Sequence, residues 1–145
     1  MHFMLEKPEF CTMKIAIAQL NYHIGNFEGN LQKMLKATAE AKGKGADLII
    51  FGELSTTGYP PRDFLEFRDE SRYFEPAKTH ATVVFKGKRI ALTVCEDLWN
   101  VGNENPLYTI CPLDKMMPDH PDFIVNVSAS PFDYNHAAER LEVLK

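Results

Sequence analysis

The chain alternates between apolar runs of strand length and one long helical period. Residues 14–20 form a short apolar run with β-branched positions, which predicts a strand buried on at least one face. Residues 47–51 form a second continuous run of this kind. The segment between them predicts a helix capped by Asn26 and ended by Gly43 and Gly45. Its apolar positions recur at helical spacing and are Phe27, Leu31, Met34, Leu35 and Ala39.

This strand-helix-strand order requires parallel strands and makes the fold class α/β. Further along, residues 83–85 and 90–94 predict a β-hairpin linked by the Gly-containing residues 86–89. The remaining apolar patterns predict a helix near 106–117, a strand over 122–127 and a helix that starts within 137–145.

Two segments lack a regular pattern. Residues 1–12 have no clear period and are interpreted as an N-terminal extension, so the domain is expected to span 13–145. Residues 60–82 are rich in proline and charge, and form a longer irregular stretch than compact domains usually contain.

The composition excludes several classes of protein. The 145 residues are 45% hydrophobic and 25% charged, which is typical of one soluble globular domain or part of one. The net charge of −4 and the absence of a basic run argue against nucleic-acid binding. The longest uncharged apolar stretch, 48–52, is too short to span a membrane. No secretory signal is recognisable at the N-terminus, so a cytoplasmic location is expected.

The cysteines and histidines do not predict a metal site. Cys11, Cys95 and Cys111 are odd in number and lack metal-ligand spacing, which favours neither a disulfide framework nor zinc. The five histidines are scattered along the chain.

Residues that could take part in catalysis follow two of the predicted strands. Glu53 comes directly after one strand, and Cys95 and Glu96 come after another. In parallel α/β sheets, ligands bind beyond the carboxyl ends of the strands, so both groups can face one site. A cysteine nucleophile needs a base for its proton, and Glu53 could serve. Alternatively, Glu53 is only a polar residue exposed to solvent at a strand end, and Cys95 only packs in the core.

Several motifs, taken in order, resemble one known family. The strings around 14–26, 51–63 and 94–99 resemble the nitrilase, or carbon-nitrogen hydrolase, superfamily. The strings 58–64, 72–76 and 126–132 look more closely like the glutaminase domains of bacterial glutamine-dependent NAD synthetases. The resemblance covers nearly all of 13–145.

The resemblance implies a nitrilase-like α-β-β-α sandwich and a Glu-Lys-Cys triad that hydrolyses glutamine through a thioester. Glu53 matches the general base and Cys95 the nucleophile. Tyr59 and Ser130 would help to hold glutamine, and Glu96 would shape the site. The family also implies a homo-oligomer.

In the family, the released ammonia reaches a C-terminal synthetase domain that amidates deamido-NAD to NAD. ATP and Mg²⁺ are the expected requirements of that domain, and no cofactor is expected in the present segment. A Gly-rich loop of the type that holds pyrophosphate does not occur in this sequence. The synthetase domain is therefore not part of these 145 residues.

The sequence departs from the family at the catalytic lysine. The motif that carries this lysine is absent, and a segment is expected to be missing near 68/69, so the sandwich is expected to be incomplete. Lys78, Lys86 and Lys88 do not match the triad position. Two alternatives stay open: a stand-alone amidase of the same superfamily, or a non-catalytic truncated module.

Overall fold

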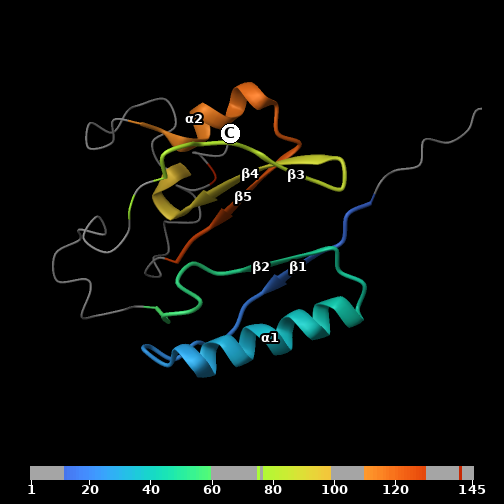
Figure 1. Cartoon of the computed structure of the whole chain (residues 1–145), viewed down its shortest axis with the longest axis vertical. Coiled ribbons are helices and arrows are strands. Elements are labelled where there is room, and N and C mark those ends of the chain that lie inside the picture. The colour runs from blue at the N-terminus through green and yellow to red at the C-terminus, as the bar shows by residue number, and fades with distance from the viewer. Residues whose placement is uncertain (1–11, 60–74, 76, 99–109, 130–140, 142–145) are drawn as a thin grey trace, which may run out of the picture.

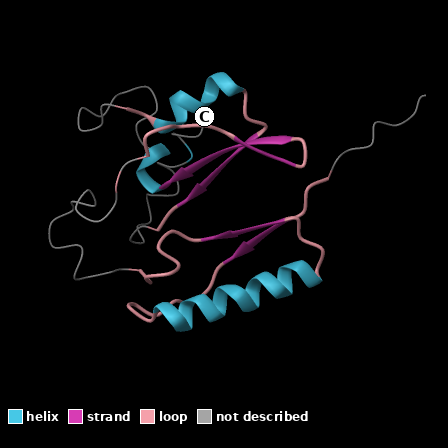
Figure 2. Ribbon diagram, viewed as in Figure 1, coloured by secondary structure: helices cyan, strands magenta, loops and turns pink. Residues whose placement is uncertain are grey.

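The strands form two sheets that lie between two helical layers (Figure 1; Figure 2). The computed structural model describes residues 12–59, 75, 77–98, 110–129 and 141. The first sheet contains β1 (Ile15–Ala18) and β2 (Leu48–Phe51), and α1 (Phe27–Gly43) forms the helical layer beside it (Figure 1). The second sheet contains β3 (Val83–Phe85), β4 (Lys88–Val94) and β5 (Phe123–Val127). The helix α2 (Pro112–Met116) covers it, and the 3₁₀ helices η3 (Cys95–Leu98) and η4 (Met117–Asp119) complete the elements.

The strand directions confirm the predicted α/β class. β1 and β2 pair in parallel, with α1 as the crossover between them. β4 lies between β3, to which it is antiparallel, and β5, to which it is parallel. In Figure 1 the order of layers is α1, the β1–β2 sheet, the three-stranded sheet and α2, so the predicted α-β-β-α arrangement is also confirmed.

Helix α1 has the predicted ends but turns a different face inward. Its Asn26 cap accepts a hydrogen bond from Gly29 N–H at 2.9 Å, as expected for an N-cap. The predicted apolar face is wrong, because Phe27, Leu31 and Leu35 are exposed. The inward positions are Asn30, Met34, Ala37 and Ala41, so of the predicted apolar positions only Met34 is partly buried.

The β3–β4 turn is shorter than predicted. Only Lys86 and Gly87 form the turn, and residues 88 and 89 belong to β4. Both turn residues have positive φ, 48° and 72°, as a two-residue type I′ turn requires. This turn matches the right-handed twist of the two strands, which explains why it replaces a four-residue link.

The helix predicted near 106–117 begins later in the structure. Ile110 and Cys111 are not helical, and α2 begins at Pro112. Proline pushes the residue before it into extended backbone, and Cys111 has φ −97° and ψ 112°. Ala91 of β4 packs against α2 in a small core, whose buried members are Ala91, Cys111, Leu113 and Met116.

Some predicted segments lie outside the described residues. These are the extension at 1–11, positions 106–109, and the C-terminal helix at 137–145 except for Leu141, which is helical. In the described part of the chain, no helix has the length and apolar character needed to cross a membrane.

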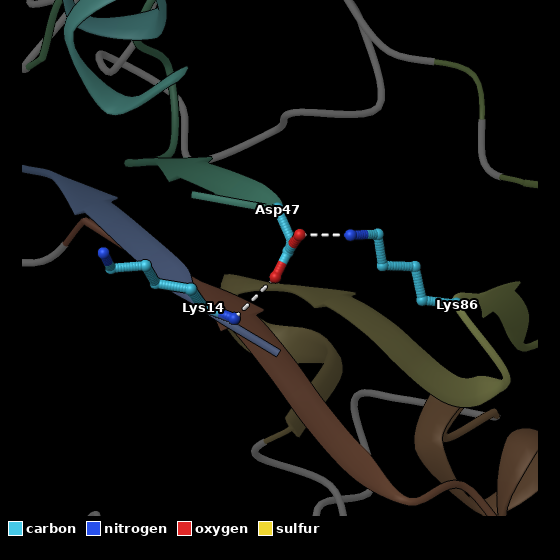
Figure 3. Close-up of polar contacts among 3 residues, drawn as sticks. All are labelled: Lys14, Asp47 and Lys86. Carbon is cyan, nitrogen blue, oxygen red and sulfur yellow. Dashed lines mark hydrogen bonds and ion pairs between the residues drawn. The ribbon is translucent and has the colours of Figure 1, made fainter. Parts of the chain in front are cut away.

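Aspartates hold the amino-terminal ends of β2 and β5. Asp47, just before β2, accepts a hydrogen bond from Lys14 N–H at 2.8 Å and pairs with Lys86 of the β3–β4 turn (Figure 3). Asp122, just before β5, accepts from Arg89 N–H at 2.7 Å and pairs with Lys88 at 3.0 Å. The Lys86–Asp47 pair joins the two sheets at this edge.

Both carboxyl groups have a pKa below the ordinary aspartate value. The hydrogen bond from Lys86 is the main cause for Asp47, followed by the main-chain N–H of Lys14. The main-chain N–H of Arg89 is the main cause for Asp122, followed by the hydrogen bond from Lys88.

We predict that the chain loses stability in acid through these two groups. A lowered folded pKa stabilises the fold above the unfolded pKa, 3.8 for aspartate, and this contribution is lost as the pH falls through the folded value. Thermal unfolding followed by circular dichroism from pH 7 to pH 2.5 measures the effect. Asp122→Asn should lower the melting temperature at pH 7 and flatten its decline below pH 5. An equally steep decline in this variant would contradict the assignment.

Candidate functional site

Glu53 stands in a tight turn directly after β2. Leu54, the next residue, has φ 54°, and Gly58 N–H closes the turn on Leu54 O at 2.8 Å. The Ser55 hydroxyl donates to Gly52 O at 2.5 Å across the same turn. These bonds fix the main chain that carries the Glu53 side chain at the carboxyl end of β2.

A buried asparagine fastens this turn to the chain after β1. Asn30 of α1 is fully buried, and its Oδ1 accepts from His23 N–H at 2.9 Å. Its Nδ2 donates to His23 O at 2.8 Å and to Thr56 O at 3.1 Å. Because Thr56 belongs to the turn after Glu53, one side chain joins the β1–α1 loop to the Glu53 turn.

Gly58 allows the main chains of the same two loops to approach each other closely. A Cβ at Gly58 would lie 2.8 Å from the main chain of Ile24, and Gly58 has φ 81°. Gly25 N–H also donates to Thr57 O at 2.9 Å. The two loops therefore meet main chain to main chain, which only glycine permits at position 58.

Cys95 stands in the corresponding place after β4. It is half-buried, begins η3 and has φ 45°. Val94 N–H donates to Asp97 Oδ2 at 2.9 Å, and Asn126 Nδ2 donates to Cys95 O at 3.3 Å. The main chain is thus held on both sides of the thiol-bearing residue.

Glu53 and Cys95 are brought to the same short segment at the end of β5. Ala129 N–H donates to Glu53 Oε2 at 2.7 Å, although the two residues are 76 positions apart. Asn126, three residues before Ala129, makes the bond to Cys95 O. The Glu53 carboxylate and the main chain of Cys95 are therefore both bonded to residues 126–129 at the end of β5.

Backbone strain is concentrated at these turns. Left-handed φ costs a non-glycine residue about 1–2 kcal/mol and is often found at functional sites. Among the described residues, four non-glycine residues have positive φ: Leu54, Lys86, Cys95 and His120. Lys86 lies in the type I′ turn and His120 at the end of η4, where such angles are ordinary. The other two lie at the Glu53 and Cys95 turns.

The other predicted site residues are only partly placed. Tyr59 is half-buried and follows Gly58 at the end of the Glu53 turn. The main chain of Glu96 lies in η3, but its side chain is outside the description, and so is Ser130. The neighbour of Ser130, Ala129, is the residue that binds Glu53.

The lysines that the sequence offered are used elsewhere. Lys86 and Lys88 make ion pairs at the amino-terminal ends of β2 and β5, at the strand ends opposite Glu53 and Cys95. Lys78 pairs with Glu75 and both side chains are largely exposed. Within the described ranges, no group of three or more His, Cys, Asp or Glu is arranged to hold a metal ion.

Sequence reasoning missed the residues that position the site. Asn126 interrupts the apolar run of β5, and that interruption was the available signal, whereas the residues next to Asn30 in α1 are mixed and give none. Thr93, also buried, lies opposite Asn126 in the β4–β5 register.

The family model for carbon-nitrogen hydrolases matches residues 14–95, more than half of the chain and the whole stretch from β1 to Cys95. The chain therefore belongs to the carbon-nitrogen hydrolase family. Within that family it is similar to the glutamine-dependent NAD(+) synthetase of Synechocystis, with 25% identity over 89% of this chain and 38% of the relative.

Solved structures share the fold. A glutamine-dependent NAD+ synthetase of Acinetobacter baumannii, in complex with ADP, superposes with TM-score 0.74 and 22% identity, over 91% of this chain and 35% of its own. An amidase of Nesterenkonia, bearing acrylamide on its active-site cysteine, superposes with TM-score 0.67 and 15% identity, over 87% of this chain and 70% of its own. The chain thus spans little more than a third of the synthetases' length.

The synthetase relative also contains residues with no counterpart here. The Synechocystis alignment extends over 210 positions but covers 89% of the 145 residues, about 129, so about 81 positions face gaps in this chain. A missing segment near 68/69 stays a prediction, because residues 60–74 lie outside the described ranges.

We predict that Asn30→Ala destabilises the fold by about 3 kcal/mol, since it removes a fully buried amide and three hydrogen bonds to the main chain of residues 23 and 56. Urea unfolding measures the change. Asn26→Ala is the matched control on the same helix, and should cost about 1 kcal/mol because it removes only the exposed cap. Equal losses in the two variants would show that the Asn30 junction has no special weight.

Proposed function

We propose that this chain is the glutaminase part of a glutamine-dependent NAD synthetase. It would hydrolyse glutamine at Cys95 and supply ammonia for the ATP-dependent amidation of deamido-NAD in a synthetase part. The observation that carries the proposal is that the Glu53 carboxylate and the Cys95 main chain are both bonded to the segment 126–129 at the end of β5. The similarity to NAD synthetases over most of the chain supports the choice of substrate.

The geometry suits Glu53 as the base. Ala129 N–H occupies Oε2, and among the described residues nothing donates to Oε1. In this proposal Oε1 takes the Sγ proton of Cys95. The resulting thiolate attacks the side-chain carbonyl carbon of glutamine, and the proton passes to the leaving nitrogen as ammonia departs. Water then hydrolyses the thioester to glutamate, with the same carboxylate as base.

The remaining roles follow from position and resemblance. Tyr59 and Ser130 are proposed to hold glutamine, and Glu96 to shape the pocket beside the nucleophile. Tyr59 ends the turn that carries Glu53, and Ser130 follows the residue that binds Glu53. ATP and Mg²⁺ are assigned to the synthetase part and not to these residues. A cytoplasmic homo-oligomer remains part of the proposal.

We predict that Cys95→Ala abolishes glutamine-driven NAD formation in the complete enzyme and leaves ammonia-driven formation within about twofold of the parent. The reason is that only glutamine cleavage needs the thiol. NAD formation is measured with glutamine and then with ammonium chloride as the nitrogen source. Equal loss of both activities would overturn the role of Cys95.

Glu53→Gln should lower the rate of glutamine hydrolysis by about 10²–10⁴-fold, the usual contribution of a general base. The Gln amide oxygen can still accept from Ala129 N–H, so the free energy of unfolding should change little. Glu53→Ala is the control, because it loses both the base and the bond and should also cost about 1–3 kcal/mol of stability. A Glu53→Gln variant that is only less stable and equally active would make Glu53 structural.

A stand-alone amidase is the second candidate. The chain covers 70% of the Nesterenkonia amidase but only 35% of the Acinetobacter synthetase, which is the observation in its favour. Release of ammonia from simple carboxamides, without NAD formation from either nitrogen source, would select it. Failure of every amide to react in the folded protein would select the non-catalytic module.

A further inference from the structure

A partly buried polar bridge connects β5 to the backbone of Cys95. Asn126 lies opposite Thr93 in the parallel β4–β5 register, and its Nδ2 donates to Thr93 Oγ1 at 3.0 Å. The same Nδ2 donates to Cys95 O at 3.3 Å. The Thr93 hydroxyl donates to Val125 O at 3.3 Å, and Thr93 is only 2% exposed.

The sheet itself does not need this side chain. β5 reads Phe-Ile-Val-Asn-Val, and an apolar residue at position 126 would fit the pattern of the strand. A polar group in this environment costs free energy unless its hydrogen bonds are made. What Asn126 adds, beyond its bond to the neighbouring strand, is a donor to the carbonyl of Cys95.

That carbonyl belongs to a residue whose backbone is strained. Cys95 has φ 45°, and relaxation to a common conformation would turn both of its peptide planes. Asp97 holds the Thr93–Val94 peptide, one residue earlier, through Val94 N–H, and Asn126 holds the peptide that follows Cys95 through Cys95 O. Because peptide groups are planar, holding the chain at these two points limits the backbone rotations at Cys95 that would redirect its side chain.

We infer that Asn126 is a positioning residue for the proposed glutamine hydrolysis: it holds the strained backbone of Cys95 so that the thiol meets the substrate carbonyl carbon. This inference rests on the proposed function. Asn126 does not touch substrate. It acts through the direction of the Cys95 main chain, so its loss impairs reactions that require alignment more than reactions of the bare thiol.

Two alkylating agents separate these effects in the complete protein. Iodoacetamide is a small reagent, and the thiolate displaces its iodide without needing the glutamine pocket. The chloromethyl ketone analogue of glutamine must bind first, and the thiolate then displaces chloride. Intact-mass spectrometry, with peptide mapping to Cys95, gives both rate constants.

In Asn126→Leu, which keeps the branched shape of the side chain but removes the donor, we expect the chloromethyl ketone rate constant to fall at least tenfold. The iodoacetamide rate constant should change by less than threefold. Asp122→Asn is the matched control, because Asp122 bridges the same two strands at their other end. This control should keep the parent's ratio of the two rate constants despite its lower stability.

The outcomes are distinguishable. An unchanged ratio in Asn126→Leu, or the same change in the control, overturns the positioning role. If the parent protein itself fails to react with the chloromethyl ketone, the proposed function fails first. Should Asn126→Leu not fold, Asn126→Ser serves instead, since its shorter side chain cannot span to both Thr93 and Cys95, and the same change of ratio is expected.

Discussion

The hydrogen bond from Ala129 N–H to Glu53 joins two sheets that share no strand pairing within the described residues. Main-chain bonds fix the strands inside each sheet, but they cannot fix one sheet against the other. Side chains supply that connection, with Glu53 at the carboxyl ends and the Asp47–Lys86 pair at the opposite edge. The candidate base is therefore also part of the framework. This dual role explains why its turn is so firmly held by Asn30 and Gly58.

The sequence predicted the elements whose signals are local. The strand-helix-strand unit from β1 to β2 follows from apolar runs, an Asn cap and terminating glycines, and all of these are present in the structure. The inward face of α1 was not predictable in this way, because packing against neighbours and not apolar content decides it. The predicted start of α2 near residue 106 was wrong, because Pro112 disfavours helical backbone at Cys111 and the helix begins at the proline.

The residues of the candidate site also differ in whether the sequence could predict them. Glu53 and Cys95 could be found because each is a reactive type that directly follows a strand, and because both match a family motif. Asn30 and Asn126 could not, because the partners that connect them to the site, Thr56 O and Cys95 O, lie 26 and 31 positions away, in segments that only the folded chain brings together. An asparagine inside a helix or strand reveals its role only when its acceptors are known. The residues that position the site can therefore be recognised only from the tertiary structure.

The long separation between Glu53 and Ala129 also bears on how the molecule assembles. Closing a loop of 76 residues costs more chain entropy than closing the 33 residues between the paired ends of β1 and β2. Contacts of high sequence separation slow folding and tend to form after the local ones. The strand-helix-strand unit is therefore suited to form early, and the carboxylate and the thiol come together only in the final docking of the two halves. A partly folded chain would carry both reactive groups but not yet the reaction centre.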